Sequence, residues 1–166
     1  MRLGFPMSSK RPPVTRFTKI KFDGAKVRLE YQVVRPSGGD PDEYTLQCAD
    51  LPLSEFTTAL RALVDDVCVI CEFPSSEASK VKVLGCSLTY TDGILGAVVT
   101  ATKDLMISPA PLILNTPHLP EKPYSEGGAM LPANTVRRVR ALCVEAERYL
   151  NGDRQQGSLF RNEAVH

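Results

Sequence analysis

Two Asp-Gly pairs, Asp23-Gly24 and Asp92-Gly93, each lie between runs in which apolar and polar residues alternate. Alternation places successive side chains on opposite faces of a strand, and Asp-Gly tolerates the positive φ angles of a tight hairpin turn. The sequence therefore predicts two β-hairpins, over residues 15–34 and 80–105. These hairpins constrain the fold most strongly, because each one fixes a pair of antiparallel neighbours.

Two further segments have the apolar spacing of amphipathic helices. Apolar residues three and four positions apart predict one helix over residues 51–67, and a second over residues 134–150 with Asn134 as its N-cap. Asn151-Gly152 is typical of a helix end. The apolar run 68–71 fits either a continuation of the first helix or a buried strand.

The remaining periodic segments, 44–48 and 109–115, predict short strands. The order β-β-β-α-β-β and then α predicts an α+β domain: an antiparallel sheet of two hairpins, with one helix between them and a C-terminal helix. The OB-fold, a small barrel that commonly binds oligonucleotides, has this order, and so has a simple antiparallel sheet covered by helices. Gly85 and Gly96, inside the second hairpin, indicate bulges or close backbone approach.

The ends of the chain lack periodicity. We expect a disordered basic arm over residues 1–14, a single domain over 15–150 and a flexible tail over 151–166. No stretch approaches the roughly 18 apolar residues of a membrane span, and the first residues hold no apolar run typical of a signal peptide. Five irregularly spaced cysteines fit reduced thiols. We therefore expect a cytoplasmic protein with no membrane partner.

The net charge of +1 conceals a separation of charge along the chain. Residues 1–35 contain nine Lys/Arg and two Asp/Glu, whereas residues 36–77 contain nine Asp/Glu and one Arg. If the fold keeps these segments apart, the protein has one basic and one acidic region. A basic region attracts polyanions at long range.

The first hairpin concentrates the basic residues. A two-residue turn at Asp23-Gly24 would pair Lys21 with Lys26 and Lys19 with Arg28, opposite a core face formed by Ile20, Phe22, Val27 and Leu29. Like charges directly opposite each other cost stability, and a phosphate backbone would relieve the repulsion. The predicted nucleic-acid-binding residues are Phe17, whose ring would stack on a base, and Lys19, Lys21, Lys26 and Arg28. Alternatively, the lysines protect the hairpin from aggregation or face an acidic surface.

The tail carries a second candidate motif, Gln156-Gly157-Ser158-Leu159-Phe160. It resembles the short peptide by which bacterial replication and repair proteins bind the sliding clamp. That resemblance implies that Leu159 and Phe160 insert into a pocket of the clamp while Gln156 bonds at its rim. Gly157 replaces the usual aliphatic residue, and six residues follow the motif. The alternative is that Leu159 and Phe160 pack onto their own domain.

Segments 90–101, 110–118 and 149–160 together resemble a family of small phage and prophage proteins. The resemblance covers most of the chain and implies no established activity. It implies a phage setting, in which nucleic-acid handling and interference with host machinery are the leading roles.

Candidate catalytic residues are few. His118, beside Asn115 and Thr116, could act as a general base, but no nucleophile is tied to it by spacing, and Thr116-Pro117 is typical of a turn. Cys68 and Cys71 have the spacing of a redox or zinc pair, but no second pair accompanies them. We therefore predict no catalytic residues, no metal and no cofactor.

These features lead to three hypotheses. The first is a non-enzymatic accessory protein of phage DNA replication or recombination, which binds single-stranded DNA through the hairpin and the sliding clamp through the tail. The second is a phage inhibitor that binds a host replication or defence protein through an acidic, DNA-mimicking face formed by residues 36–77. The third is a small hydrolase centred on His118.

Overall fold

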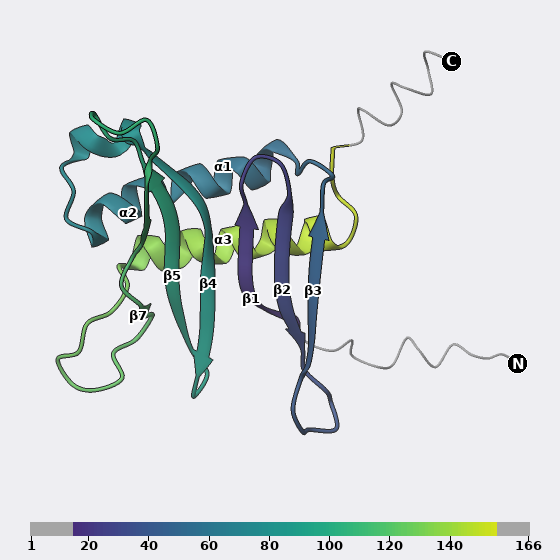
Figure 1. Ribbon diagram of the computed structural model, residues 1–166. Helices are drawn as coiled ribbons and strands as arrows, with labels where there is room; N and C mark the ends of the chain where they lie inside the picture. Colours follow the sequence, from purple (N-terminus) through teal and green to yellow (C-terminus); the bar gives the residue numbers. More distant parts are fainter. Residues whose placement is uncertain (1–14, 156–166) are drawn as a thin grey trace, which may run out of the picture.

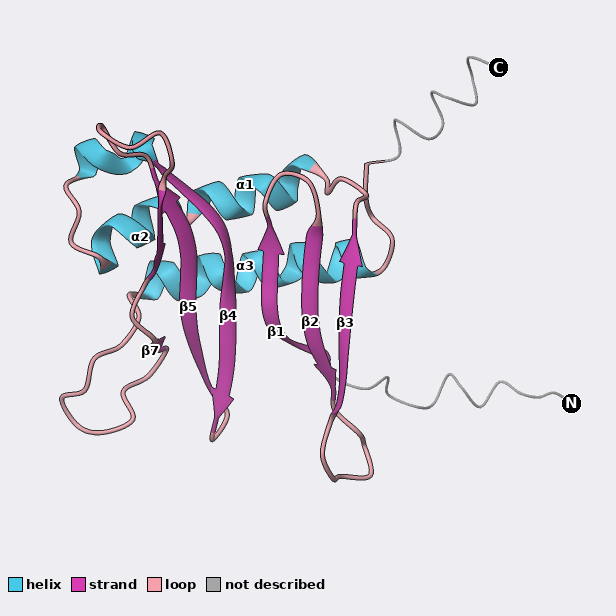
Figure 2. Cartoon of the chain, in the orientation of Figure 1, coloured by secondary structure: helices cyan, strands magenta, loops and turns pink. Residues whose placement is uncertain are grey.

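The structure, a computed structural model, describes residues 15–155 as a twisted antiparallel sheet with helices on one of its faces (Figures 1 and 2). The strands are β1 (Thr15–Phe22), β2 (Val27–Val33), β3 (Asp42–Cys48), β4 (Val81–Thr91), β5 (Ile94–Lys103), β6 (Leu112–Asn115) and β7 (Leu119–Pro120). The helices are α1 (Ser54–Ala62), α2 (Val64–Ile70), the 3-10 helix η2 (Ser75–Lys80) and α3 (Ala133–Leu150). The α+β class and both hairpins are confirmed.

The sheet has the order β3-β2-β1-β4-β5-β6, with β7 paired to part of β5. All pairs are antiparallel. The sheet is open, with β3 and β6 as its edge strands, and is not closed into a barrel of the OB type. Antiparallel sheets commonly pack one face on the core and leave the other uncovered, and within residues 15–155 this sheet does so.

The two halves of the sheet meet at a short junction. Strands β1 and β4 pair only at Lys19–Lys21 with Gly85–Ser87. A bulge between Val83 and Gly85 bends β4 at the end of this junction where Lys21 pairs with Gly85. A Cβ atom on Gly85 would lie 1.9 Å from the carbonyl oxygen of Ile20, so the close approach expected at this glycine is confirmed.

The core lies between the sheet and the helices. From the first hairpin, Ile20, Val27 and Leu29 are fully buried, as predicted. Helices α1 and α3 contribute Phe56, Val139, Leu142 and Tyr149, and the turn between α1 and α2 contributes Leu63. Complete burial of large apolar side chains stabilises a fold by about 1.5–3 kcal/mol each, so this layer holds the helices on the sheet.

One buried charge joins two helices. The Asp66 side chain in α2 is 5% exposed and accepts hydrogen bonds from Thr135 Oγ1 at 2.6 Å and from Arg138 Nη1 at 3.1 Å. Thr135, in the first turn of α3, is fully buried. The carboxylate is therefore paired and hydrogen-bonded, as a buried charge must be.

Two helix predictions need correction. The helix expected over residues 51–67 is divided at Leu63, whose N–H donates to the Leu60 carbonyl three residues earlier; this tight turn redirects the chain into α2, which continues through the apolar run to Ile70. Asn134 is not the N-cap of α3, because the helix begins one residue earlier and the Asn134 side chain accepts from Arg137. Within residues 15–155, no helix is long and apolar enough to cross a bilayer.

Candidate nucleic-acid interface

One face of the sheet lies opposite the helices (Figure 2). The residues whose side chains point to this face are mostly polar. The register of the strands brings together on it Gln47, Arg28, Glu30, Lys19, Lys21, Ser87, Thr89, Val98 and Thr100. The matching residues on the other face, including Ile20, Cys86 and Val99, are buried under the helices. The open face is therefore a polar surface supported by a packed core.

Small-molecule sites commonly occupy roughly 300–1,000 Å³, and the open face contains a hollow of about 540 Å³ at its centre. Lys19 and Lys21 form its wall on β1. Its other lining residues are Ser87, Val98, Thr100, Asn115 and Thr116. Gly85 lies between Lys21 and Thr100 in the register and adds no side chain, which leaves space between them.

The polar groups around this hollow are held in place by the strands. Thr100 Oγ1 donates to Asn115 Oδ1 at 2.6 Å, and the Val99 N–H donates to Thr116 Oγ1 at 2.8 Å. Lys19 and Lys21 form no ion pair with another described residue. Two ammonium groups beside hydroxyl and amide groups form a surface suited to a phosphate-bearing anion.

The prediction that Phe17 shares this face is wrong. A bulge at Thr18 adds one residue to β1 between Phe17 and Ile20, and therefore turns both side chains toward the helices. Phe17 is 4% exposed, packs against Tyr31, and its carbonyl accepts a hydrogen bond from Tyr90 Oη. Its ring is not available to stack on a base.

The predicted register of the first hairpin also needs correction. Asp23 Oδ1 accepts from the N–H groups of Ala25 and Lys26, which makes a longer turn than the two-residue one expected. These bonds also lower the pKa of the Asp23 carboxyl. The pairing is shifted by two residues, so the same side chains face the core, but Lys21 lies opposite Arg28 and Lys19 lies opposite Glu30.

The four predicted cations therefore do not oppose one another in two pairs. Lys26 lies in the exposed turn outside the strands. Arg28 forms a 2.8 Å ion pair with Glu30 and donates to the Gln47 side chain. The structure brings Lys19 and Lys21 to the hollow, and leaves Arg28 at its side with its charge partly neutralised.

The basic and acidic segments of the sequence are not separated in space, because β3 of the acidic segment pairs along its whole length with β2. Several of the acidic residues form ion pairs: Asp42 with Arg35, Asp50 with Arg154, Asp66 with Arg138, and Glu77 with Lys103 and Lys80. The bond from Lys103 lowers the pKa of Glu77. The condition for two separate charged regions is therefore not met.

His118 lies at the end of the open face. Its Nε2 atom is 2.8 Å from Thr89 Oγ1, and its ring covers Gly96, where a Cβ would come within 2.4 Å of Nε2. A hydroxyl within hydrogen-bond reach of a histidine is one part of a nucleophile–base pair. Among residues 15–155, no carboxylate accepts a hydrogen bond from the other ring nitrogen to orient it.

The cysteines have the environment of core residues. Cys68 and Cys71 lie at the end of α2 as free thiols, and burial raises the pKa of both. Burial also raises the pKa of Cys143 to about 11. Raised thiol pKa values disfavour the thiolate that redox chemistry and metal ligation require. Residues 15–155 contain no group of three side chains arranged to hold a metal.

The chain after α3 stays attached to the domain through Gln155, five residues beyond the expected boundary at residue 150. Arg154 pairs with Pro52 as a β-bridge, and its guanidinium lies 4.3 Å from the centre of the Tyr149 ring. Gln155 donates to the carbonyls of Leu51 and Pro52. The predicted clamp-binding residues Gln156, Leu159 and Phe160, like the predicted arm over residues 1–14, lie outside the described residues.

The sequence alone did not identify Ser87, Thr100, Asn115 and Thr116 as neighbours of the two lysines. A signal was present: hydroxyl residues occupy alternate positions of the second hairpin, opposite its predicted core residues.

Comparison of the chain with protein-family models, curated proteins and solved structures finds no match.

Proposed function

We propose that the protein binds single-stranded nucleic acid on the open face of its sheet, around Lys19 and Lys21. The observation that carries the proposal is the central hollow, where two lysines without a described ion-pair partner lie beside fixed hydroxyl and amide groups. Each ammonium group can neutralise one phosphate, and the hydroxyl groups can bond phosphate or sugar oxygens. The resemblance to phage proteins supports a role in DNA replication or recombination in the cytoplasm of a bacterial host.

The position of Phe17 affects the kind of binding expected. Since its ring lies in the core and no aromatic side chain of residues 15–155 lines the hollow, this part of the chain offers charge and hydrogen bonds there but no stacking platform. Phosphate and sugar contacts hold the backbone without distinguishing the bases. We therefore expect binding that depends weakly on base sequence and strongly on salt concentration.

The test is fluorescence anisotropy of a labelled oligothymidylate with the wild-type protein and the Lys19→Ala/Lys21→Ala variant over a series of salt concentrations. On a single strand, each phosphate contact contributes about 0.7 to the slope of log K against log salt, so the variant should bind at least tenfold more weakly with a slope shallower by about 1.4.

Lys122→Ala/Arg137→Ala is the matched control, because it removes two exposed cations that do not line the hollow, one from the loop after β7 and one from α3. This control should retain wild-type affinity. Equal binding by the wild-type protein and the Lys19/Lys21 variant at low salt would disprove the assigned interface.

We further propose that the tail recruits the protein to the sliding clamp through Gln156, Leu159 and Phe160. The anchoring of the chain up to Gln155 supports this, because it fixes the point on the domain from which the motif begins. Tethering to a clamp on DNA would raise the local concentration of the open face near its ligand.

A pull-down with purified clamp tests this second contact. The wild-type protein should retain the clamp, and Leu159→Ala/Phe160→Ala should lose it, because the apolar anchors supply most of the binding energy of such short peptides. Asn162→Ala/Glu163→Ala, just beyond the motif, is the control and should bind as wild type. Retention of the clamp by the Leu159/Phe160 variant would exclude this role of the motif.

The other two hypotheses have less support. The DNA-mimic inhibitor needs free carboxylates on one face, whereas many of those in residues 36–77 are paired with cations. The hydrolase is supported by the contact between Thr89 and His118, but among the described residues this pair has no orienting carboxylate.

A further inference from the structure

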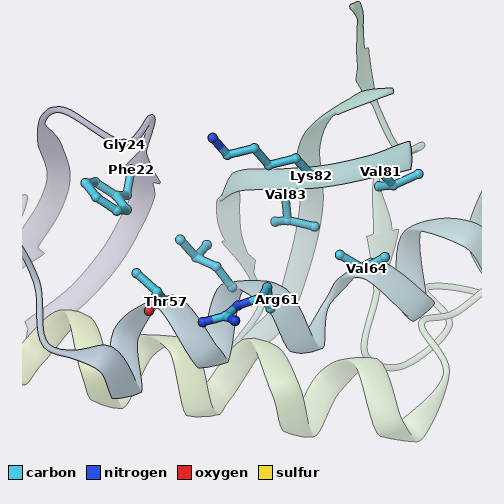
Figure 3. Close-up of a pocket in the computed structure, with 9 residues that line it drawn as sticks. Phe22, Gly24, Thr57, Arg61, Val64, Val81, Lys82 and Val83 are labelled. Atoms are coloured by element: carbon cyan, nitrogen blue, oxygen red, sulfur yellow. The ribbon is translucent and has the colours of Figure 1, made fainter. Parts of the chain in front are cut away.

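A second cavity, of about 370 Å³, lies between the tip of the first hairpin, helix α1 and the start of β4 (Figure 3). Apolar side chains make most of its wall: Phe22, Leu60, Val64, Val81 and Val83. Leu60, Val81 and Val83 are at most 7% exposed, so the floor of the cavity belongs to the core. Phe22 is held by an edge-on contact with Phe56.

The cavity follows from the bend in the sheet. Strands β1 and β4 are hydrogen-bonded only as far as Lys21 and Gly85, and beyond the bulge β4 runs away from the first hairpin. The strands therefore leave a gap at this end of the sheet, and α1 runs along one side of it (Figure 3). Strands and helices supply all of its lining residues except Gly24, which lies in the hairpin turn.

Among the described residues, two cations and no carboxylate line the cavity. Arg61 extends from α1 and Lys82 extends from β4 across the opening (Figure 3). The Lys82 ammonium reaches the hairpin turn at Gly24. Neither side chain forms an ion pair with another described residue.

We propose that this cavity binds a small amphiphilic anion, namely a medium-chain alkyl carboxylate, with its hydrocarbon chain among the apolar residues and its carboxylate between Arg61 and Lys82. The volume lies within the range of roughly 300–1,000 Å³ that small-molecule sites occupy. Binding buries apolar surface of the ligand, and the two cations favour an anionic head.

The lining discriminates against a nucleobase. Among the nine lining residues, Thr57 supplies the only uncharged polar side chain, so most of the ring nitrogens and exocyclic groups of a base would lose their bonds to water without replacement. A hydrocarbon chain has no such groups. The cavity is therefore separate in its chemistry from the hollow around Lys19 and Lys21.

The test is isothermal titration calorimetry of the full-length protein with decanoate below its micelle concentration. Decanoate should bind one molecule per chain with saturation. Decanol, which has the same chain length but no charge, should bind the wild-type protein at least tenfold more weakly than decanoate does. Decanoate should likewise bind the Arg61→Ala/Lys82→Ala variant at least tenfold more weakly than it binds the wild-type protein. Val64→Phe, which fills the cavity from the helix side, should abolish binding while circular dichroism shows a folded protein.

Lys19→Ala/Lys21→Ala is the matched charge control and should bind decanoate as the wild-type protein does. Deoxyadenosine monophosphate tests the alternative of a nucleotide site. The proposal is overturned if the binding of decanoate does not saturate, or if Val64→Phe binds decanoate as the wild-type protein does. It is also overturned if Lys19→Ala/Lys21→Ala weakens decanoate binding as much as Arg61→Ala/Lys82→Ala does, or if the nucleotide competes with decanoate for the cavity. These outcomes are independent of whether the open face binds nucleic acid.

Discussion

Gly85→Ala should destabilise the protein by more than about 4 kcal/mol, a loss far above that of an ordinary substitution. The added Cβ would lie 1.9 Å from the Ile20 carbonyl oxygen and 2.8 Å from Lys21 Cα. Both are backbone atoms of β1, so a change of rotamer cannot remove the clash, and β1 must move away from β4. The junction contains only three residue pairs, and it would be lost along its whole length. Urea unfolding followed by circular dichroism measures the effect.

Gly96→Ala is the matched control in the same hairpin. Its Cβ would meet the His118 ring and the Thr89 hydroxyl, which are the ends of side chains at the open face. These groups can rotate into solvent, so we expect a loss of about 1 kcal/mol, typical of single substitutions. Similar free energies of unfolding for Gly85→Ala and Gly96→Ala would show that the junction tolerates separation of the strands.

Asp66→Ala is expected to lower the free energy of unfolding by about 3 kcal/mol, the cost of breaking a buried ion pair from one side. The substitution leaves the fully buried Thr135 hydroxyl without its acceptor and removes the charge that faces Arg138. Arg138 is 33% exposed and can regain water, which keeps the cost at the lower end of the range for such pairs. The same unfolding measurement applies.

The neighbouring residue provides the control for this prediction. Asp65 is exposed on the same helix, so Asp65→Ala should change stability by no more than about 0.5 kcal/mol. Asp66→Asn keeps an acceptor for Thr135 while it removes the charge, and should fall between the two variants. If Asp66→Ala costs no more than Asp65→Ala, the buried carboxylate does not hold α2 on α3.

Local sequence patterns predicted most elements of the fold because hairpins and amphipathic helices are specified by nearby residues. Asp92-Gly93 forms the expected turn of the second hairpin, in which Thr91 pairs with Ile94. At Asp23-Gly24 the Asp23 side chain bonds the next turn residues and lengthens the loop, which the dipeptide alone does not reveal. The bulge at Thr18 has no sequence signature either, and for that reason Phe17 was predicted on the wrong face of the sheet.

The candidate site could be predicted only in part. Lys19 and Lys21 follow from alternation within one strand, so the sequence was sufficient to place them on one face. Ser87, Thr100 and Asn115 reach them only through the pairing of β1 with β4, which joins residues distant in the chain. The cavity beside Phe22 arises where that pairing stops, and no local pattern marks such a position.

The short junction between β1 and β4 has a consequence for the order of assembly. Strands β1 to β3 and strands β4 to β6 each form from neighbours in the sequence, whereas Ile20 and Cys86 are 66 residues apart. Closing so long a loop carries an entropic cost that local hairpins avoid, and contacts between distant residues slow folding. This topology favours late docking of two preformed halves. Hydrogen exchange at the amide protons of the β1–β4 junction should therefore report whether the two halves have docked.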